Sequence, residues 1–315
     1  MKEQFLKDVD HGLSQPQKHL SSKYFYDRKG DELSMQIMAM PEYYLTRSEL
    51  EIFQLQTDEM IKALQVDKNE PFELIELGAG DGTKTKYLLH GLLDAGYQFE
   101  YLPVDISLNV LNHLQVSLRE ELPELTVKPQ HGDYFEILSE AQGSRLPKVV
   151  LFLGSNIGNL KDHQAAKFIY DLGVYLKPGD KLMIGVDKVK PVDVVLPAYN
   201  DKAGLTSQFN INLLHRINVE LGGDFQLDDF YHAPEYTQEE GVARSFLTSK
   251  KDQTVTISQT GKSYDFQKGE KIHMEISRKY TTEIINEIIR DTDFEIIEVL
   301  SDSLNYFSDY ILQRR

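Results

Sequence analysis

The chain has 315 residues, of which 41% are hydrophobic and 27% are charged, as in a globular protein with one large domain or two smaller ones. Its formal net charge of −16 repels nucleic-acid phosphates, so we expect a small-molecule partner and no nucleic acid. The absence of cysteine rules out disulfides and thiolate metal sites and fits a reducing cytoplasm.

The first 48 residues are expected to mix helix and loop. The N-terminal sequence MKEQFLKDVDHGL has no apolar core of signal-peptide length, and no run approaches membrane-spanning length. We therefore expect a cytoplasmic protein with no membrane partner. We also expect it to be a monomer. Two tyrosine-rich stretches follow, SSKYFYDRKG and MPEYYLTR. The segment TRSE, Thr46 to Glu49, then predicts a capping box that opens an amphipathic helix, ELEIFQLQTDEMIKAL.

From residue 72 onward, apolar strands alternate with helices. The expected strands are FELIEL, FEYLPVDIS, LTVKPQH, KVVLFL and KLMIGVD, and helical patterns follow the first, second and fourth of them, whereas the third runs into an acidic turn at Asp133. Strands and helices in this alternation form βαβ units around a parallel sheet. The sequence therefore predicts an α/β fold of the Rossmann type.

The alternation stops after Asp187. Roughly residues 189–279 mix helical stretches (LPAYNDKAGLTSQFNINLLHRINVEL) with alternating strands, and a helix and two strands then complete the sheet. We therefore expect one domain at 49–188 with 280–315, and a second α+β domain at 1–48 with 189–279. The first domain would bind a cofactor and the second a substrate.

A glycine turn follows the first strand of the α/β region. In ELGAGDG, the glutamate is Glu76, and Gly78, Gly80 and Gly82 recur at every second position. Thr83 stands where a dinucleotide-binding G-x-G-x-x-G motif needs its third glycine, which disfavours an NAD-linked dehydrogenase. The tighter spacing resembles motif I of S-adenosylmethionine (SAM) methyltransferases.

Acidic residues end the next two strands. Asp105 follows the second strand, where a carboxylate can accept hydrogen bonds from ribose hydroxyls, and Asp133 follows the third. Asp133 is placed to accept from an adenine amino group while Tyr134 lies along the base. The alternative is that both aspartates only cap helices. Three acids at successive strand ends beside a glycine turn favour SAM binding.

The ordered set of motifs resembles the histidine-specific SAM-dependent methyltransferases. The motifs are KYFYD, PEYYLTR, ELGAGDGTKT, PVDIS, GDYF, FLGSNIGNL, AYND, GLTSQFN and MEIS, and the resemblance runs from about Lys23 to the C-terminus. It implies a class I methyltransferase domain with a second, substrate-binding domain. It also implies SAM as cofactor and methylation of the α-amino nitrogen of histidine, to trimethylhistidine, on the route to ergothioneine.

The resemblance also implies the site residues. For the substrate, Tyr43, Asn159 and Tyr199 match positions that hold the amino and carboxylate groups, Tyr26 a position near the reacting nitrogen, and Glu275 with Ser277 the pair that grips the imidazole. For the cofactor, the matching positions are Glu76, Gly78, Gly80 and Lys84 of motif I, Asp105 at the ribose, and Asp133 with Tyr134 at the adenine. We expect Tyr43 and Glu275 to share one pocket.

One stretch departs from the family pattern. In EEGVARSFLTSKKDQTV, Arg244 and Ser245 stand where a bulky apolar side chain is expected to enclose the imidazole. The acceptor could therefore be a different amino acid or another small amine. A non-catalytic SAM-binding protein on the same fold is a further alternative. The nine histidines show no H-x-x-H or H-E-x-x-H spacing, so we expect no metal site.

Overall fold

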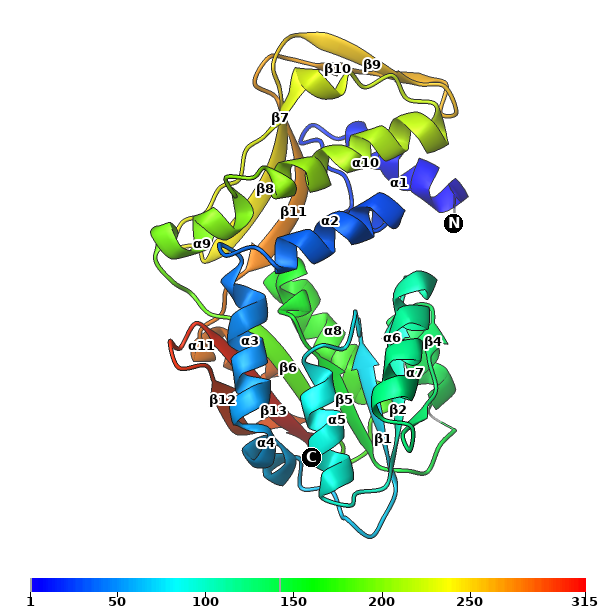
Figure 1. Cartoon of the computed structure of the whole chain (residues 1–315). Coiled ribbons are helices and arrows are strands. Elements are labelled where there is room, and N and C mark those ends of the chain that lie inside the picture. Colours follow the sequence, from blue (N-terminus) through cyan, green and yellow to red (C-terminus); the bar gives the residue numbers. More distant parts are fainter. Residues whose placement is uncertain (1, 142) are drawn as a thin grey trace. The chain divides into compact units, whose positions relative to one another are not determined.

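A computed structural model describes residues 2–141 and 143–315, and the chain divides into two compact units (Figure 1). The insertion unit comprises Met1–Tyr44 and Lys190–Ser277, and the Rossmann unit comprises Leu45–Val189 and Arg278–Arg315. In the part of the chain that the structure describes, no helix has both the length and the apolarity needed to cross a bilayer.

The Rossmann unit is built on one twisted sheet. Its strand order is β12-β13-β6-β5-β1-β2-β3, with β4 also paired to β2. The bounds are β1 Phe72–Leu77, β2 Phe99–Asp105, β3 Thr126–Val127, β4 Gln130–His131, β5 Lys148–Phe152, β6 Lys181–Asp187, β12 Phe294–Ser301 and β13 Phe307–Arg314. Only β13 runs antiparallel to both of its neighbours among these pairings. The sheet is therefore the class I methyltransferase form of the Rossmann fold, and the predicted α/β class is confirmed.

The third predicted strand is broken into two short pieces. LTVKPQH forms β3 and β4, each two residues long, and Pro129 lies between them. Proline has no N–H to donate to a ladder, so the strand cannot continue through it. The edge of the sheet is kept in place by neighbouring bonds such as Lys128 N–H to the Tyr101 carbonyl, 2.8 Å.

Helices cover the sheet with apolar side chains. Those of the unit are α3 Tyr44–Leu55, α4 Thr57–Leu64, α5 Thr85–Asp94, α6 Leu108–Glu121, α7 Tyr134–Ala141, α8 Asp162–Tyr175 and α11 Thr282–Ile289. Helices α7, α8 and α11 bury Leu138, Leu172 and Ile288 in one cluster with the strand residues Val150 and Ile184. The burial of such side chains supplies most of the stabilisation of the sheet.

The capping box predicted at Thr46 is wrong. Helix α3 already begins at Tyr44, so Thr46 lies inside it, and the predicted single helix ends at Leu55 before α4 begins at Thr57. Glu49 does not close a cap. Its carboxylate accepts the backbone N–H of Gly154, a residue 105 positions further along the chain.

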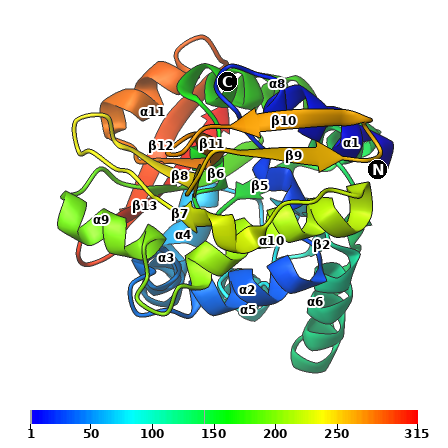
Figure 2. The ribbon, with the colours of Figure 1, turned by 90° about the horizontal axis from the view of Figure 1, so that it is seen from above.

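The insertion unit combines helices with two small sheets. Its helices are α1 Lys2–Leu13, α2 Arg28–Met38, α9 Val192–Tyr199 and α10 Leu205–Leu221, and its strands are β7 Phe230–His232, β8 Val242–Ser249, β9 Gln253–Ile257, β10 Lys262–Phe266 and β11 Lys271–Arg278. The strands form a three-stranded sheet, β11-β8-β7, and a hairpin, β9–β10. Helices α2 and α10 pack against each other, and Figure 2 shows α10 running below the hairpin in that view.

The helix predicted over Leu196–Leu221 is divided in two. Gly204 has φ +73°, and the Asp201 carboxylate accepts the N–H groups of Leu205 and Thr206 at 2.8 and 2.9 Å. Asp201 therefore caps a new helix, α10, where the sequence suggested a continuous one. Strand β8, in the stretch GVARSFLTS, was also not predicted.

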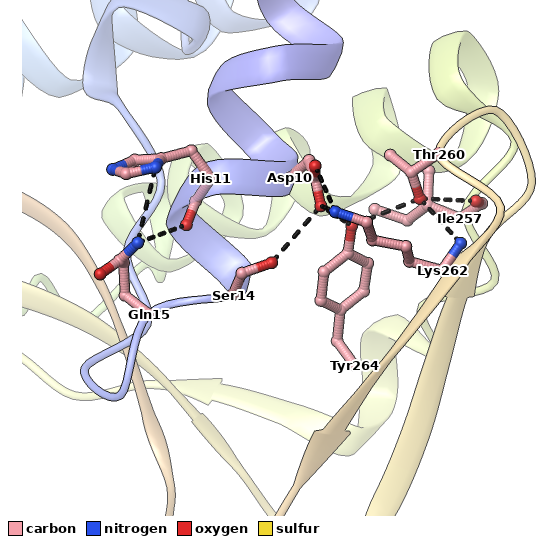
Figure 3. A network of polar contacts seen from close by, with 8 residues as sticks. All are labelled: Asp10, His11, Ser14, Gln15, Ile257, Thr260, Lys262 and Tyr264. Atoms are coloured by element: carbon pink, nitrogen blue, oxygen red, sulfur yellow. Dashed lines mark hydrogen bonds and ion pairs between the residues drawn. The ribbon is translucent and has the colours of Figure 1, made fainter.

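Polar contacts hold α1 to the hairpin within the insertion unit (Figure 3). The Asp10 carboxylate accepts hydrogen bonds from Lys262 Nζ at 2.7 and 2.8 Å and from the Tyr264 hydroxyl at 2.8 Å. The bond from Lys262 lowers the pKa of Asp10. Beneath these contacts, Phe5 and Val9 of α1 are buried in the apolar core of the unit.

Candidate functional site

The glycine turn between β1 and α5 requires glycine. Gly78, Gly80 and Gly82 all have positive φ, at +75°, +57° and +67°. A Cβ on Gly78 would lie 2.9 Å from the Tyr134 hydroxyl and 3.1 Å from Asn156 Nδ2, whereas a Cβ on Gly80 would have no neighbour within 4 Å. The turn is thus closely packed at Gly78 and open at Gly80, which leaves room for a ligand against the backbone.

Glu76 lies beneath this turn at the end of β1. Its carboxyl group is buried and accepts hydrogen bonds from the Thr85 hydroxyl at 2.7 Å and the Tyr101 hydroxyl at 2.5 Å. Burial raises the pKa of Glu76 to about 7. Both of its partners belong to the protein, so Glu76 fastens the start of α5 to the neighbouring strand β2.

The two strand-end aspartates make local backbone contacts. The half-buried Asp105 accepts the N–H groups of Gly80 at 3.2 Å and Ser107 at 2.9 Å, and its burial raises its pKa. Asp133 is exposed and accepts the Phe135 N–H at 2.9 Å, at the start of α7. Asp105 is therefore brought to the glycine turn, while Asp133 caps the N-terminus of α7.

Tyr134 places an aromatic ring beside the turn. Its hydroxyl is the nearest atom to the Gly78 Cβ position, and its ring lies edge-on to Phe152 with centroids 6.0 Å apart. Burial raises the pKa of this phenol, so it is neutral at physiological pH. The ring thus belongs to the same group of side chains as Gly78 and Asn156.

The turn after β5 adds residues to this group. Gly154 and Ser155 have φ +72° and +57° and lead into a short 3-10 helix, η2, Asn156–Asn159. Asn156 faces Gly78, although the sequence offered no reason to select it over its neighbours. The predicted Asn159 is exposed at the end of η2.

Lys84 forms an ion pair with Glu49, a residue that the sequence did not identify as part of the site. Its ammonium group pairs with the carboxylate of Glu49, whose side chain is 1% exposed. Glu49 also accepts the Gly154 N–H with both oxygens, at 2.9 and 3.0 Å. It thereby links the glycine turn of β1 to the turn after β5.

In the insertion unit, three of the predicted substrate residues form a chain of contacts. The rings of Tyr43 and Tyr199 meet edge to face with centroids 6.4 Å apart, and the Tyr199 hydroxyl donates to Ser277 Oγ at 2.8 Å. Glu275 precedes Ser277 by two residues on β11, so their side chains leave the strand on the same face. Tyr43, Tyr199, Ser277 and Glu275 are therefore brought together.

Tyr26 packs against helix α10, whereas His232 contacts Tyr199, a member of this chain of contacts. Tyr26 is 42% exposed and lies edge-on to Phe209 of α10. His232, which the sequence did not single out, contacts the Tyr199 carbonyl through Nε2 at 2.8 Å. Its Nδ1 is buried with no hydrogen-bond partner among the described residues, and burial lowers its pKa.

Comparison with known proteins decides the family. The family described as histidine-specific, SAM-dependent methyltransferases matches residues 5–314. The chain belongs to this family. It is 37% identical over 279 residues to a histidine N-alpha-methyltransferase of Mycolicibacterium smegmatis, covering 88% of this chain and 84% of that one. A relative with the same name in Mycobacterium tuberculosis is 35% identical over 280 residues, covering 89% and 85%.

A longer relative carries a pathway name. The ergothioneine biosynthesis protein 1 of Schizosaccharomyces pombe is 28% identical over 312 residues, covering 94% of this chain but 39% of that one. Family membership confirms that the protein is a SAM-dependent methyltransferase and that SAM is its methyl donor. The structure and the comparisons leave the individual site residues as predictions.

The stretch that departs from the family pattern lies on β8. Phe246 contacts His273 of β11, with ring centroids 5.4 Å apart, so these two side chains share one face of the sheet. Arg244 and Glu275 each lie two residues from one member of that pair, and alternation places them on the same face. Ser245 points to the other side and is buried. Arg244 pairs with Glu240.

No group of three or more histidine, aspartate or glutamate side chains is placed to hold a metal ion within residues 2–141 and 143–315. The polar groups gathered in the two units are instead amides, hydroxyls, phenols and carboxylates. Such groups bind organic ligands by directed hydrogen bonds.

Proposed function

We propose that this methyltransferase transfers methyl groups from SAM to the α-amino nitrogen of L-histidine, giving trimethylhistidine on the route to ergothioneine. The observation that carries the proposal is the chain of contacts from Tyr43 through Tyr199 to Ser277, with Glu275 on the same strand face. The 37% identity to a histidine N-alpha-methyltransferase supports the same substrate.

The cofactor belongs, in this proposal, to the turns of the Rossmann unit. Bound SAM supplies a methyl group on a sulfonium sulfur, which is the electrophile. Gly78 and Gly80 let the backbone approach the ligand, and the open position at Gly80 fits a group lying against the turn. Asp105 would accept hydrogen bonds from the ribose hydroxyls, Asp133 would accept one from the adenine amino group, and Tyr134 would lie along the base. Glu76 and Lys84 hold the turn in shape.

The neutral side chains of the proposed substrate site suit an amine nucleophile. An amine attacks only through its lone pair, so it must be bound unprotonated and aligned, and positioning can supply much of the rate. Tyr43, Tyr199 and Asn159 offer phenol and amide groups that orient the amino and carboxylate groups without adding formal charge. Tyr26 lies near the reacting nitrogen. Aromatic rings also attract the cation that forms as methyl groups accumulate, by about 0.5–2 kcal/mol.

The imidazole is assigned to strand β11. Glu275 accepts the imidazole N–H, and the Ser277 hydroxyl contacts the other ring nitrogen while it is itself held by Tyr199. A site built to pair with both ring nitrogens leaves buried polar groups unpaired when a different side chain enters. This arrangement gives selectivity for histidine over apolar amino acids.

The test is a direct assay of the reaction. Purified protein is incubated with SAM and L-histidine, and the products are followed by mass spectrometry. Successive additions of one, two and three methyl groups to histidine are expected. The absence of a methylated product across all proteinogenic amino acids would contradict the proposal.

A different acceptor is the second candidate, and Arg244 is the observation that favours it. Arg244 lies on the same sheet face as Glu275, so a cation stands where an apolar side chain is expected to enclose the imidazole. A panel of amines, with S-adenosylhomocysteine formation as the readout, separates the two candidates. A protein that binds SAM and methylates nothing in this panel would instead be a non-catalytic SAM-binding protein.

We further propose that the enzyme works as a monomer in the cytoplasm on a free small molecule. The absence of cysteine and the strongly acidic composition support a reducing compartment and no nucleic-acid partner. Light scattering during size-exclusion chromatography tests the first part, because a mass near 36.2 kDa is expected and a multiple of it would contradict the proposal.

A further inference from the structure

Two carboxyl groups meet in the interior of the Rossmann unit, next to the turns assigned to the cofactor. Glu49 comes from α3 and Asp309 from β13, and both residues are buried. They meet above Gly185 of β6, which pairs with Asp309 in the sheet. A Cβ on Gly185 would lie 2.1 Å from Glu49 Oε1 and 3.0 Å from Asp309 Oδ1. Only glycine leaves space for both groups.

The two carboxyl groups differ in their donors. Glu49 receives the Gly154 N–H and the Lys84 ammonium group. Neither oxygen of Asp309 has a hydrogen-bond donor among the residues that the structure describes. Its close polar neighbour is the Glu49 carboxyl, which is an acceptor unless one of the two groups carries a proton. A buried carboxylate without donors is strongly unfavourable.

The charged groups around Asp309 also favour a proton on one of the two carboxyl groups. The groups that face Asp309 are Glu49 of α3, Lys84 at the start of α5 and, beyond Lys84, Glu76 of β1. Its cross-strand neighbours are Gly185 and the apolar Leu300. Three buried carboxyl groups therefore share a single ammonium group. Burial and the charge of Glu49 raise the pKa of Asp309, and the Lys84 charge only partly opposes them.

We propose that Asp309 is protonated and donates its proton to Glu49, forming a carboxyl pair that holds the cofactor turns in position. With Asp309 neutral, the Glu49 carboxylate keeps both of its donors, the Lys84 ammonium group and the Gly154 N–H. Lys84 follows the glycine turn, and Gly154 opens the turn that carries Asn156. Glu49 is a positioning residue, and Asp309 acts through it.

The effect of this carboxyl pair on cofactor binding rests on the proposed SAM site, whereas its effect on stability does not. A carboxyl group that stays protonated in the native state and ionises in the unfolded chain makes stability fall as pH rises, from the ordinary carboxyl pKa up to its raised native pKa. An asparagine at 309 keeps a donor and has no proton to lose. The stability of Asp309→Asn relative to the native protein must therefore improve with rising pH.

The experiment measures melting temperatures of the native protein, Asp309→Asn and Asp309→Leu from about pH 5 to about pH 8. We expect Asp309→Asn to be as stable as the native protein or more so, with an advantage that grows with pH. We expect Asp309→Leu, which also has no proton to lose but lacks a donor, to be less stable than Asp309→Asn at every pH. An Asp309→Asn variant that is as damaged as Asp309→Leu, or whose advantage shrinks with pH, would overturn the protonated state.

The second measurement concerns the cofactor. Calorimetric titration of SAM should show an affinity for Asp309→Asn within about twofold of the native value, and a loss of about tenfold or more for Glu49→Gln, in which the charged partner of Lys84 is removed. Equal affinities for Glu49→Gln and the native protein would overturn the positioning role. A native protein that binds no SAM would refute the proposed function instead, and the melting-temperature result would be unaffected.

Discussion

The two units carry their proposed ligand residues in different ways. In the Rossmann unit, these residues follow the ends of consecutive strands, as Gly78 follows β1 and Asp105 ends β2. In the insertion unit, Tyr43, Tyr199 and Ser277 are more than 70 residues apart in the chain and meet only through tertiary packing. The last two are 78 positions apart. A cofactor site of the first kind can be recognised locally, whereas a substrate site of the second kind needs the folded chain.

This contrast predicts separable effects, and the largest belongs to the insertion unit. Glu275→Ala should weaken histidine binding by about 10- to 100-fold, because a charge-assisted hydrogen bond contributes about 1.5–3 kcal/mol. SAM binding should be unchanged, as calorimetry with each ligand alone would show. Glu275→Gln, which keeps an acceptor of the same shape, is the matched control and should lose less. An equal loss of affinity for histidine and for SAM would contradict the assignment of Glu275 to the substrate alone.

The next prediction concerns the glycine turn. Gly78→Ala should lower both the stability of the protein and its SAM affinity, because it combines a backbone strain of about 1–2 kcal/mol with contacts to Tyr134 and Asn156. Gly80→Ala is the matched control. It has a similar backbone strain and no protein neighbour within 4 Å, so it should keep more stability while its added methyl group still obstructs the ligand. Thermal melts and SAM titrations check both variants. Equal loss of stability would show that Gly78 is not closely packed.

A smaller effect should follow the loss of one hydrogen bond. Tyr199→Phe keeps the ring against Tyr43 and removes the hydroxyl that holds Ser277 at 2.8 Å. We expect kcat/KM for histidine to fall by about fivefold, the effect of a neutral hydrogen bond of about 1 kcal/mol, with SAM affinity retained. If the variant matched the native enzyme, the Tyr199–Ser277 bond would have no part in binding.

The smallest expected effect is a pH dependence confined to the insertion unit. Burial lowers the pKa of His232 below its ordinary value of 6.5, so the unfolded chain takes up a proton that the native state resists. The stability of the protein should therefore fall as the pH drops below about 6.5. His232→Gln, which keeps a donor for the Tyr199 carbonyl, should melt with a weaker acid dependence. An identical acid dependence in both proteins would show that His232 does not contribute to it.

The difference between the units also explains which features could be predicted. Strand periodicity, the glycine spacing and the strand-end acids predicted the fold class and the cofactor of the Rossmann unit, and the family resemblance predicted the enzyme class. All three are confirmed. Strand β8 was missed because GVARSFLTS is not cleanly alternating, and the break at Asp201 was missed because Asp201 caps a helix that the hydrophobic pattern alone makes continuous.

Glu49 is the most instructive error. TRSE has the residues of a capping box, and local sequence gives that interpretation. The side chain instead turns into the interior, where its partners Gly154, Lys84 and Asp309 come from three other parts of the chain. A fully buried carboxyl group of this kind has no local signature. The residues of the substrate site were predicted through family resemblance rather than pattern, and their roles stay predictions.

The central claim, that the residues proposed for the cofactor belong to the Rossmann unit and those proposed for the imidazole to the insertion unit, is tested most directly by hydrogen–deuterium exchange with S-adenosylhomocysteine alone and then with added histidine. We predict that S-adenosylhomocysteine slows exchange at the turns following β1, β2 and β5, and that histidine adds protection around Tyr43, Tyr199 and Glu275–Ser277. Histidine protection that leaves β11 and Tyr199 unchanged would contradict the account.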